Sequence, residues 1–306
     1  MSAAPDFFPL PEPRSLPPFD RGRALVLGGA GAVGNAWEIG LVAGLLEGGL
    51  DVTDADLVVG TSGGATAAIQ LTSGRSPRDL LADILDTATP RPTPPPAAPA
   101  GPAVDHLART GAIIATASDP ADMRRRMGAA AIGLDPDGSA SARWRSIVAA
   151  RLTGLDWPQR AVLIPAVDAR TGDPVVLHCG SGVQLVDAVA ASTSSGAAYR
   201  VGERRFLDGG YRRNENADLA AGVARVLVLS PFGGRTRHPE EWGMQLTAQV
   251  EGLRKGGSRV ETVFPADDAA HLFGPDAGNV ALRPAAARSG RSQGRSLAER
   301  LGPFWR

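Results

Sequence analysis

The sequence contains one cysteine, Cys179, and carries no net charge, and each of these shortages excludes a class of protein. A single cysteine excludes an intrachain disulfide, which is consistent with a reducing, cytoplasmic location. The 32 basic residues are balanced by 32 acidic residues, so the composition gives no sign of nucleic-acid binding. We therefore expect a cytoplasmic protein without a nucleic-acid partner. The composition does not indicate an oligomeric state.

Long apolar runs are also missing. No run approaches the roughly 18 apolar residues of a membrane span, and residues 1–20 lack the basic and apolar regions of a signal peptide. Any contact with lipid is therefore expected to be peripheral, at the membrane surface. Residues 283–306 hold six arginines and one acid, Glu299, and include Phe304 and Trp305. Such a segment can bind anionic headgroups, or it can be the solvated face of a helix.

The chain divides by composition into three parts. Residues 1–22 are rich in proline and are predicted to be a flexible lead-in. Residues 23–282 are expected to form one enzyme-sized domain, followed by the Arg-rich segment 283–306. An insertion over about residues 75–158 begins with a proline-rich stretch, Pro90–Pro102, and continues as a largely helical region. Proline-rich sequence of this kind is excluded from helices and central strands, so we expect an exposed loop there.

Strand and helix signals alternate in the first 71 residues. Apolar runs at 24–27 and 56–60 predict buried strands, and the patterns at 34–46 and 64–71 predict the helices that follow them. This alternation is typical of an α/β fold with a parallel sheet. Further strands are expected at 161–169, 175–178, 204–207, 225–229 and 260–264, and further helices at 183–191 and 245–253.

The segment Gly60-Thr61-Ser62-Gly63-Gly64 matches the pattern G-x-S-x-G between a predicted strand and a predicted helix. In that context the serine lies on a sharp turn with its hydroxyl projecting, and glycines on both sides allow strand and helix to approach. A second match, centred on Ser292, lies in a polar, Arg-rich stretch with no strand before it. We therefore interpret Ser62 as the candidate nucleophile and the match at Ser292 as fortuitous.

The glycine-rich segment 28–34, GGAGAVG, permits two interpretations. Read alone, it matches the dinucleotide fingerprint G-x-G-x-x-G. That fingerprint requires an acidic residue at the C-terminal end of the second strand, whereas Asp51, Asp54 and Asp56 all precede the second predicted strand. The alternative is an oxyanion hole, in which backbone N–H groups at a helix N-terminus face the carbonyl oxygen under attack.

Asp208-Gly209-Gly210 follows a predicted strand and supplies a candidate general base. An Asp-Gly pair is also a common hairpin turn. A carboxylate at a strand end followed by two glycines is nevertheless unobstructed beside a substrate. If the strands are parallel, their C-terminal ends share one edge, so we expect Asp208 to lie near Ser62. It could then accept the serine proton, provided that the site holds it close and partly desolvated.

These three motifs occur in the order found in bacterial patatin-like phospholipases, which the chain resembles over roughly residues 23–232. The resemblance implies a three-layer α/β/α fold with a mainly parallel central sheet and a Ser62–Asp208 dyad. It also implies an oxyanion hole from Gly29, Ala30 and Gly31, and hydrolysis of lipid acyl esters without a metal or cofactor. The sequence departs from the family at Val33, where a basic residue is common, and at 192–199, where a proline is usual.

Two alternatives remain at the sequence level. A Ser-His-Asp α/β-hydrolase would use one of four histidines, of which His271 lies late in the chain, where that fold places its histidine. A non-catalytic dinucleotide-binding protein would use the glycine-rich segment alone. The acyl donor, the headgroup and the final acyl acceptor are not indicated by any motif.

Overall fold

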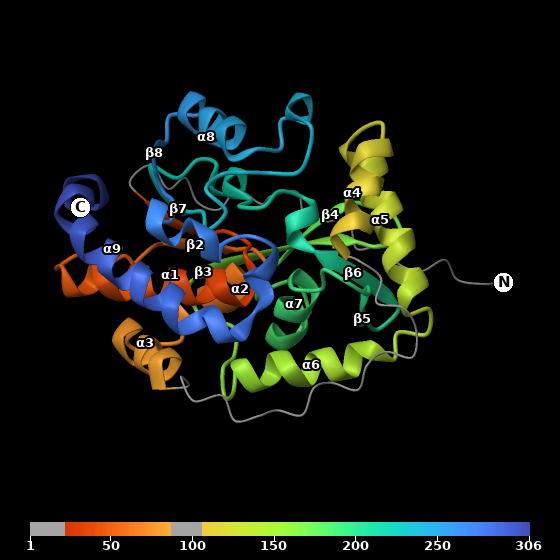
Figure 1. Ribbon diagram of the computed structural model, residues 1–306, viewed down its shortest axis with the longest axis horizontal. Coiled ribbons are helices and arrows are strands. Elements are labelled where there is room, and N and C mark those ends of the chain that lie inside the picture. Colours follow the sequence, from red (N-terminus) through yellow and green to blue (C-terminus); the bar gives the residue numbers. More distant parts are fainter. Residues whose placement is uncertain (1–21, 87–105) are drawn as a thin grey trace.

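The computed structural model describes residues 22–86 and 106–306. Figure 1 shows a central sheet with helices packed on both of its faces. The predicted lead-in at 1–22, apart from Gly22, and the predicted proline-rich loop at 90–102 lie outside the described residues. The α/β/α fold expected from the sequence is confirmed.

The sheet is mixed and has eight strands in the described chain. Its order is β5-β6-β3-β2-β1-β7-β8, with β4 paired to β3. The central block β3-β2-β1-β7-β8 is parallel throughout, as the strand–helix alternation predicts. At β3 the pattern changes, because β4 and β6 both run antiparallel to it. The strands are β1 (Arg23–Leu27), β2 (Leu57–Gly60), β3 (Ala161–Asp168), β4 (Pro174–Leu177), β5 (Tyr199–Val201), β6 (Arg204–Asp208), β7 (Arg225–Leu229) and β8 (Arg259–Val263).

Alternate side chains of the buried strands point into two different cores, one on each face of the sheet, and this gives the fold three layers. Leu25 and Leu27 of β1 belong to the larger core, under α1, α2, α7 and α9, whereas Ala24 and Val26 belong to the opposite core, under α8. Successive strand side chains point to opposite faces, so a wholly apolar strand needs cover on both sides. These helices are α1 (Gly31–Glu47), α2 (Gly63–Leu71), α7 (Leu185–Ser192), α8 (Leu246–Lys255) and α9 (Arg283–Trp305).

The described residues between α2 and β3 are largely helical; helices were expected after the proline-rich stretch, whereas α3, which precedes it, was not expected. They include α3 (Pro77–Asp86), α4 (His106–Thr116), α5 (Pro120–Leu134) and α6 (Ala140–Arg151). Helices α4 and α5 form a separate apolar cluster with the ends of β3 and β6, which includes Met123, Val167 and Leu207. Helix α6 packs against α7 instead, where the Trp144 indole N–H donates to the Ala190 carbonyl at 3.2 Å. Helices α4, α5 and α6 of the insertion therefore lie at the antiparallel half of the sheet, whereas α3 packs against α1 and α9.

Helix α9 packs along α1 through small residues on both helices (Figure 1). A Cβ atom at Gly290 would lie 2.3 Å from the Trp37 carbonyl oxygen, and one at Gly294 would lie 2.2 Å from that of Leu41. Both glycines of the second G-x-S-x-G match are thus required by helix packing, and Ser292 between them is exposed. This confirms that the match at Ser292 is not a nucleophile turn, because it lies within a helix.

Replacing Gly294 by leucine should strongly destabilise the protein. The new side chain meets backbone of α1 rather than a movable side chain, so the helices must separate and lose their buried contact. We expect the free energy of unfolding to fall by about 3 kcal/mol or more. Urea denaturation measures the loss, and Ser292→Ala on the exposed face of α9 is the matched control. Equal stability of Gly294→Leu and the control would contradict the packing described here.

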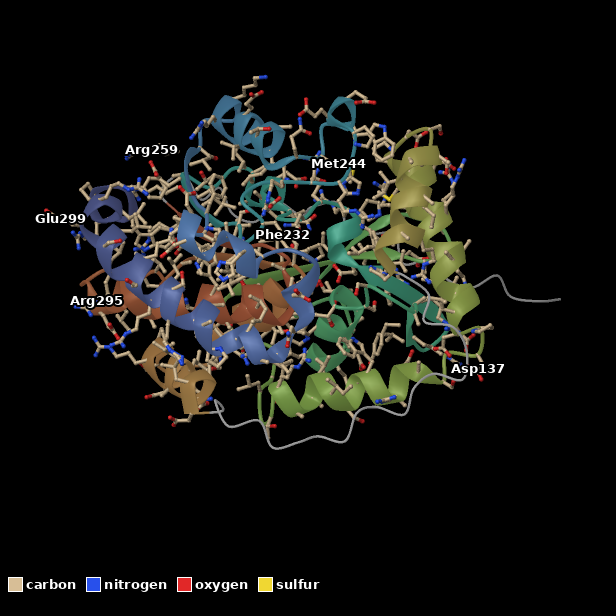
Figure 2. The ribbon with its side chains drawn as sticks, viewed as in Figure 1. Asp137, Phe232, Met244, Arg259, Arg295 and Glu299 are labelled. Carbon is tan, nitrogen blue, oxygen red and sulfur yellow. The ribbon has the colours of Figure 1, made fainter. Side chains whose placement is uncertain are left out.

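The arginines of α9 mostly face the protein's own acids. Arg291 and Arg295 contact Glu47, and Arg300 contacts Glu261 at 2.9 Å. Figure 2 shows Arg295 and Glu299 on the outer side of the helix. Phe304 and Trp305 are buried in the larger core, which removes them from contact with a lipid surface. No helix within residues 22–86 and 106–306 is long and apolar enough to cross a membrane.

Candidate active site

Ser62 lies at the turn between β2 and α2 in a conformation that is unfavourable for a side-chain-bearing residue. Its φ is 52° and its ψ is −119°, and positive φ in a non-glycine residue often marks functional strain. The glycines of the motif permit this turn. A Cβ at Gly60 would lie 2.6 Å from the Gly64 carbonyl oxygen, and a Cβ at Gly64 would lie 2.3 Å from that of Leu27. The strand and the helix therefore approach more closely than any larger residue allows.

Asp208 lies near Ser62 as predicted, but the direction of the strand that positions it differs from the prediction. Strand β6 is antiparallel to β3, whereas β2 is parallel to it, so β2 and β6 run in opposite directions. Val59 pairs with Leu163 and Asp208 pairs with Ala166, which brings the C-terminal ends of β2 and β6 to neighbouring positions on β3. The expectation of a shared parallel edge was therefore wrong, although the proximity it predicted is present.

The Ser62 hydroxyl donates a hydrogen bond to Asp208 Oδ2 at 2.7 Å. The other carboxylate oxygen, Oδ1, accepts the Gly210 N–H at 2.8 Å. Burial raises the pKa of Asp208 to about 6 from 3.8, although the hydrogen bonds from Gly210 and Ser62 act to lower it. Gly209 is needed for close approach, because a Cβ there would lie 2.2 Å from the Pro165 carbonyl oxygen. The carboxylate is thus fixed in position and poorly solvated beside the serine hydroxyl.

Polar groups outside the sequence motifs connect the turns that contain Ser62 and Asp208. The Asn216 amide donates to Thr61 Oγ1 at 3.0 Å and to the Gly209 carbonyl at 3.2 Å, so it links the two turns. The Ser192 hydroxyl accepts the Ser62 N–H at 3.0 Å. The Ser194 carbonyl accepts the Asp208 N–H at 3.0 Å. Sequence reasoning did not assign these roles, because each depends on contacts between residues far apart in the chain.

The glycine-rich loop lies against the nucleophile turn. A Cβ at Gly29 would lie 3.3 Å from Ser62 Cβ, and one at Gly63 would lie 2.2 Å from the Gly31 carbonyl oxygen. The Gly29 N–H donates to the Asn214 carbonyl at 3.0 Å. In contrast, the N–H groups of Ala30 and Gly31 donate to no acceptor in the described part of the chain. Gly31 has a φ of 57°, which turns the chain into α1.

The histidines are engaged elsewhere. His271, the residue favoured by the Ser-His-Asp alternative, is exposed, and its Nδ1 lies 2.9 Å from the Asp268 carbonyl oxygen. His238 stacks on Trp242, and burial lowers its pKa to about 4. His178 Nδ1 accepts the Gly180 N–H at 3.1 Å. Across residues 22–86 and 106–306, no group of three or more His, Cys, Asp or Glu side chains is placed to hold a metal ion.

Comparison with known protein families identifies the family of this chain. The model of the family described as patatin-like phospholipase matches residues 25–221, which include all three motifs. Fold and family match together define an enzyme that hydrolyses lipid acyl groups. The chain belongs to the patatin-like phospholipase family.

Solved structures similar to this chain are bacterial proteins of low sequence identity. VipD from Legionella pneumophila is 12% identical, with a TM-score of 0.43 over 91% of this chain and 67% of VipD. ExoU of the type III secretion system of Pseudomonas aeruginosa, solved with SpcU, is 17% identical, with a TM-score of 0.39 over 95% of this chain. This chain spans 53% of that ExoU chain, about half of its length. No curated protein sequence matches this chain.

Proposed function

We propose that the protein cleaves carboxylic esters of lipids with a Ser62–Asp208 dyad. The observation that carries this proposal is the 2.7 Å hydrogen bond from the Ser62 hydroxyl to Asp208 Oδ2, at a strained turn. Asp208 accepts the hydroxyl proton while Ser62 Oγ attacks the substrate carbonyl. The proton then passes to the leaving alcohol, and an acyl-serine remains. Water, activated in turn by Asp208, releases the fatty acid and restores Ser62.

The raised pKa of Asp208 supports its role as a base. An aspartate with its usual pKa of 3.8 is a weak base at neutral pH, and burial brings this pKa to about 6. A base is most effective when its pKa lies near the working pH. No histidine is needed in this scheme, and His271 bonds to a backbone carbonyl in an exposed segment. The dyad is therefore preferred over the Ser-His-Asp alternative.

The oxyanion hole is assigned to the backbone N–H groups of Ala30 and Gly31. Both lie in the loop that contacts Ser62 and Gly63, and both lack an acceptor in the described chain. The Gly29 N–H was also expected to contribute, but it donates to Asn214. In this role Gly29 shapes the loop by permitting the close approach to Ser62. The N–H groups stabilise the negative oxygen of the tetrahedral intermediate without rearranging.

An apolar cavity of about 340 Å³ is lined in part by the segment that follows Ser192, and we assign it to the acyl chain, although neither Ser62 nor Asp208 lines it. Its lining includes Trp144 and Ile147 of α6 and the segment Thr193–Tyr199. That segment begins beside Ser192, which bonds to Ser62, and contains Ser194, which bonds to Asp208. An apolar lining favours a fatty acyl group over a charged one. Substrates are therefore expected to be esters of long-chain fatty acids, including phospholipids and lysophospholipids.

A fluorophosphonate probe and a substrate panel test this function. The probe should modify Ser62 covalently, and mass spectrometry of the modified peptide identifies the site. The panel should contain a phospholipid, a lysophospholipid and simple esters with short and long acyl chains, and we expect faster cleavage of the long chains. His271→Ala should be labelled at the same rate as the original protein. Failure of the folded protein to react with the probe would exclude the proposed serine chemistry.

A further inference from the structure

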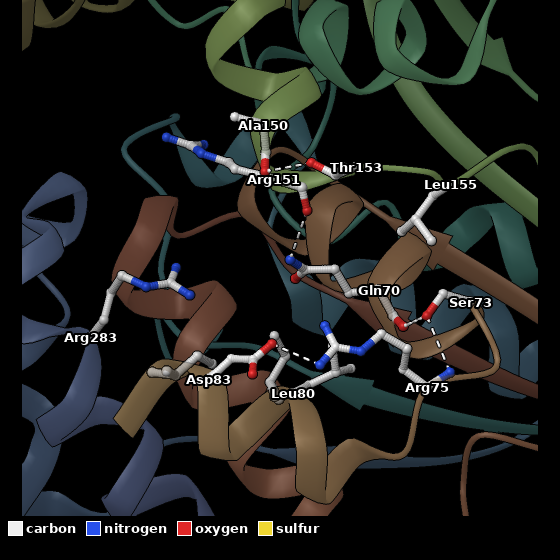
Figure 3. A pocket seen from close by; sticks show the side chains of 12 residues that line it. Gln70, Ser73, Arg75, Leu80, Asp83, Ala150, Arg151, Thr153, Leu155 and Arg283 are labelled. Carbon is white, nitrogen blue, oxygen red and sulfur yellow. Dashed lines mark hydrogen bonds and ion pairs between the residues drawn. The ribbon is translucent and has the colours of Figure 1, made fainter. Parts of the chain in front are cut away.

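A second cavity of about 260 Å³ lies away from the dyad, at the opposite end of α2. Ser62 precedes α2, whereas Gln70 near its end lines this cavity. A helix rises about 1.5 Å per residue, so the two sites are separated by about 12 Å along α2. Figure 3 shows the cavity between the α2–α3 turn, the end of α6 and the start of α9, and each of these elements contributes one arginine. The arginines are Arg75, Arg151 and Arg283.

Positive charge exceeds negative charge in this cavity. Among the described residues that line it, Asp83 is the only carboxylate, and its Oδ2 is paired with Arg75 at 2.7 Å (Figure 3). Neither Arg151 nor Arg283 forms an ion pair within the described chain. The Arg151 guanidinium lies over the Trp144 ring, 5.5 Å from its centroid, and donates no hydrogen bond to a described residue. Two guanidinium groups at this cavity therefore lack an acidic partner within the described chain; Arg283 is half-buried and Arg151 is exposed.

Partial desolvation and mutual repulsion make this arrangement of charges less favourable in the absence of an anion. Desolvation lowers the pKa of both Arg151 and Arg283, and repulsion between the two contributes to the shift at Arg283, whose pKa falls to about 10. Arg283 is partly held by the protein, because its Nη1 donates to Asn35 Oδ1 at 2.9 Å and to the Ala32 carbonyl at 3.2 Å. Its Nε and Nη2 have no acceptor in the described chain. These donors are available to an anion in the cavity.

We propose that this cavity is a second binding site for a phosphate-class oxyanion, held by Arg151 and Arg283. Guanidinium groups bind phosphate through paired, charge-assisted hydrogen bonds. A tetrahedral oxyanion between the two arginines neutralises both charges and removes their mutual repulsion. The cavity is larger than one phosphate ion, so the ligand is expected to be a phosphate monoester. Such a group occurs on small soluble metabolites and on the headgroup of phosphatidic acid.

The cavity is connected to the nucleophile turn through Asn35. The Asn35 amide donates to Gln70 Oε1 at 3.1 Å and to the Gly63 carbonyl at 3.5 Å, and its Oδ1 accepts from Arg283. Gly63 directly follows Ser62. Two successive hydrogen bonds, from Arg283 to Asn35 and from Asn35 to Gly63, therefore connect an anion bound to Arg283 with the nucleophile turn. The proposed site itself does not depend on hydrolysis at Ser62.

Calorimetric titration with inorganic phosphate at low salt tests the proposal. We expect saturable binding at one site in the original protein and in Ser62→Ala. Arg151→Gln and Arg283→Gln should each weaken it about tenfold or more, the loss typical of one charge-assisted hydrogen bond. The matched control is Arg143→Gln, an exposed arginine on the same helix as Arg151, which should bind phosphate normally.

Circular dichroism confirms that each variant is folded. Arg151→Gln is decisive if Arg283→Gln unfolds, because the Arg151 guanidinium forms no hydrogen bond within the described chain. Glycerol 3-phosphate and phosphatidylcholine vesicles containing phosphatidic acid identify the source of the ligand. Arg151-dependent binding of the first indicates a soluble monoester, and Arg151-dependent binding of the second indicates a lipid headgroup. No saturable phosphate binding by the folded protein, or equal loss in Arg143→Gln, would overturn the proposal.

Discussion

Ser62→Ala is expected to lower the rate of ester hydrolysis by about a thousandfold or more while the protein stays folded. The substitution removes the oxygen that is proposed to attack the substrate carbonyl, so the acyl-serine cannot form. The strained turn contains the same backbone with alanine, so stability should change little. Initial rates on the most rapidly cleaved ester of the panel, with denaturation curves in parallel, measure both effects.

Ser292→Ala is the matched control for this variant. Ser292 lies in the same G-x-S-x-G pattern but on the exposed face of α9. Its removal should leave the rate within experimental error of the original. Retention of more than a few per cent of activity by a pure preparation of Ser62→Ala would show that Ser62 is not the nucleophile.

Asp208→Asn should have opposite effects on activity and on stability. The amide keeps the shape of the carboxylate but cannot accept the Ser62 proton, so the rate should fall nearly as far as in Ser62→Ala. Burial of the charged Asp208 carboxylate destabilises the folded protein, and the rise of its pKa from 3.8 to about 6 is a measure of this destabilisation. Each unit of pKa corresponds to about 1.4 kcal/mol, so the variant should be more stable at pH 7 by up to about 3 kcal/mol.

The raised pKa of Asp208 also determines how stability and activity change with pH. The folded protein holds the Asp208 proton more tightly than the unfolded chain does, so ionisation of Asp208 lowers stability as the pH rises from about 4 to about 6. The stability difference between Asp208→Asn and the original should therefore disappear near pH 4. Activity of the original should rise through about pH 6, where Asp208 becomes a base. Urea denaturation and initial rates at several pH values measure these changes.

His271→Ala is the control that separates the dyad from the Ser-His-Asp alternative. It should keep most of the activity, since His271 is exposed and bonds to a backbone carbonyl. An inactive but folded His271→Ala, together with an active Asp208→Asn, would require the alternative. A destabilised Asp208→Asn at pH 7 would show that the hydrogen bonds to the carboxylate outweigh the cost of its burial.

The strands and helices near the nucleophile could be predicted because their sequence patterns are local. The apolar run before Ser62 and the helix after it are present as β2 and α2. Helix α3 and strand β5 were not predicted: α3 lies directly before the proline-rich stretch, which was expected to begin an exposed loop, and β5 has only three residues. The antiparallel direction of β6 also escaped prediction, since an apolar strand has the same pattern in either direction.

Within the candidate site, motif residues could be named but their hydrogen bonds could not. The motif does not distinguish Gly29, Ala30 and Gly31 as donors. The structure shows that the Gly29 N–H donates to the Asn214 carbonyl. Asn216 and Ser192 were not assigned to the site for the same reason. Their partners are distant in sequence, and only the folded sheet brings them together.

The packing of α9 along α1 has a consequence for biosynthesis. Helix α1 begins at the glycine-rich loop, and its groove of small residues is filled only by residues 283–305. While a ribosome is still translating that region, α1 has no partner in the groove. The final packing of α1 therefore depends on a segment that is translated long after α1 itself.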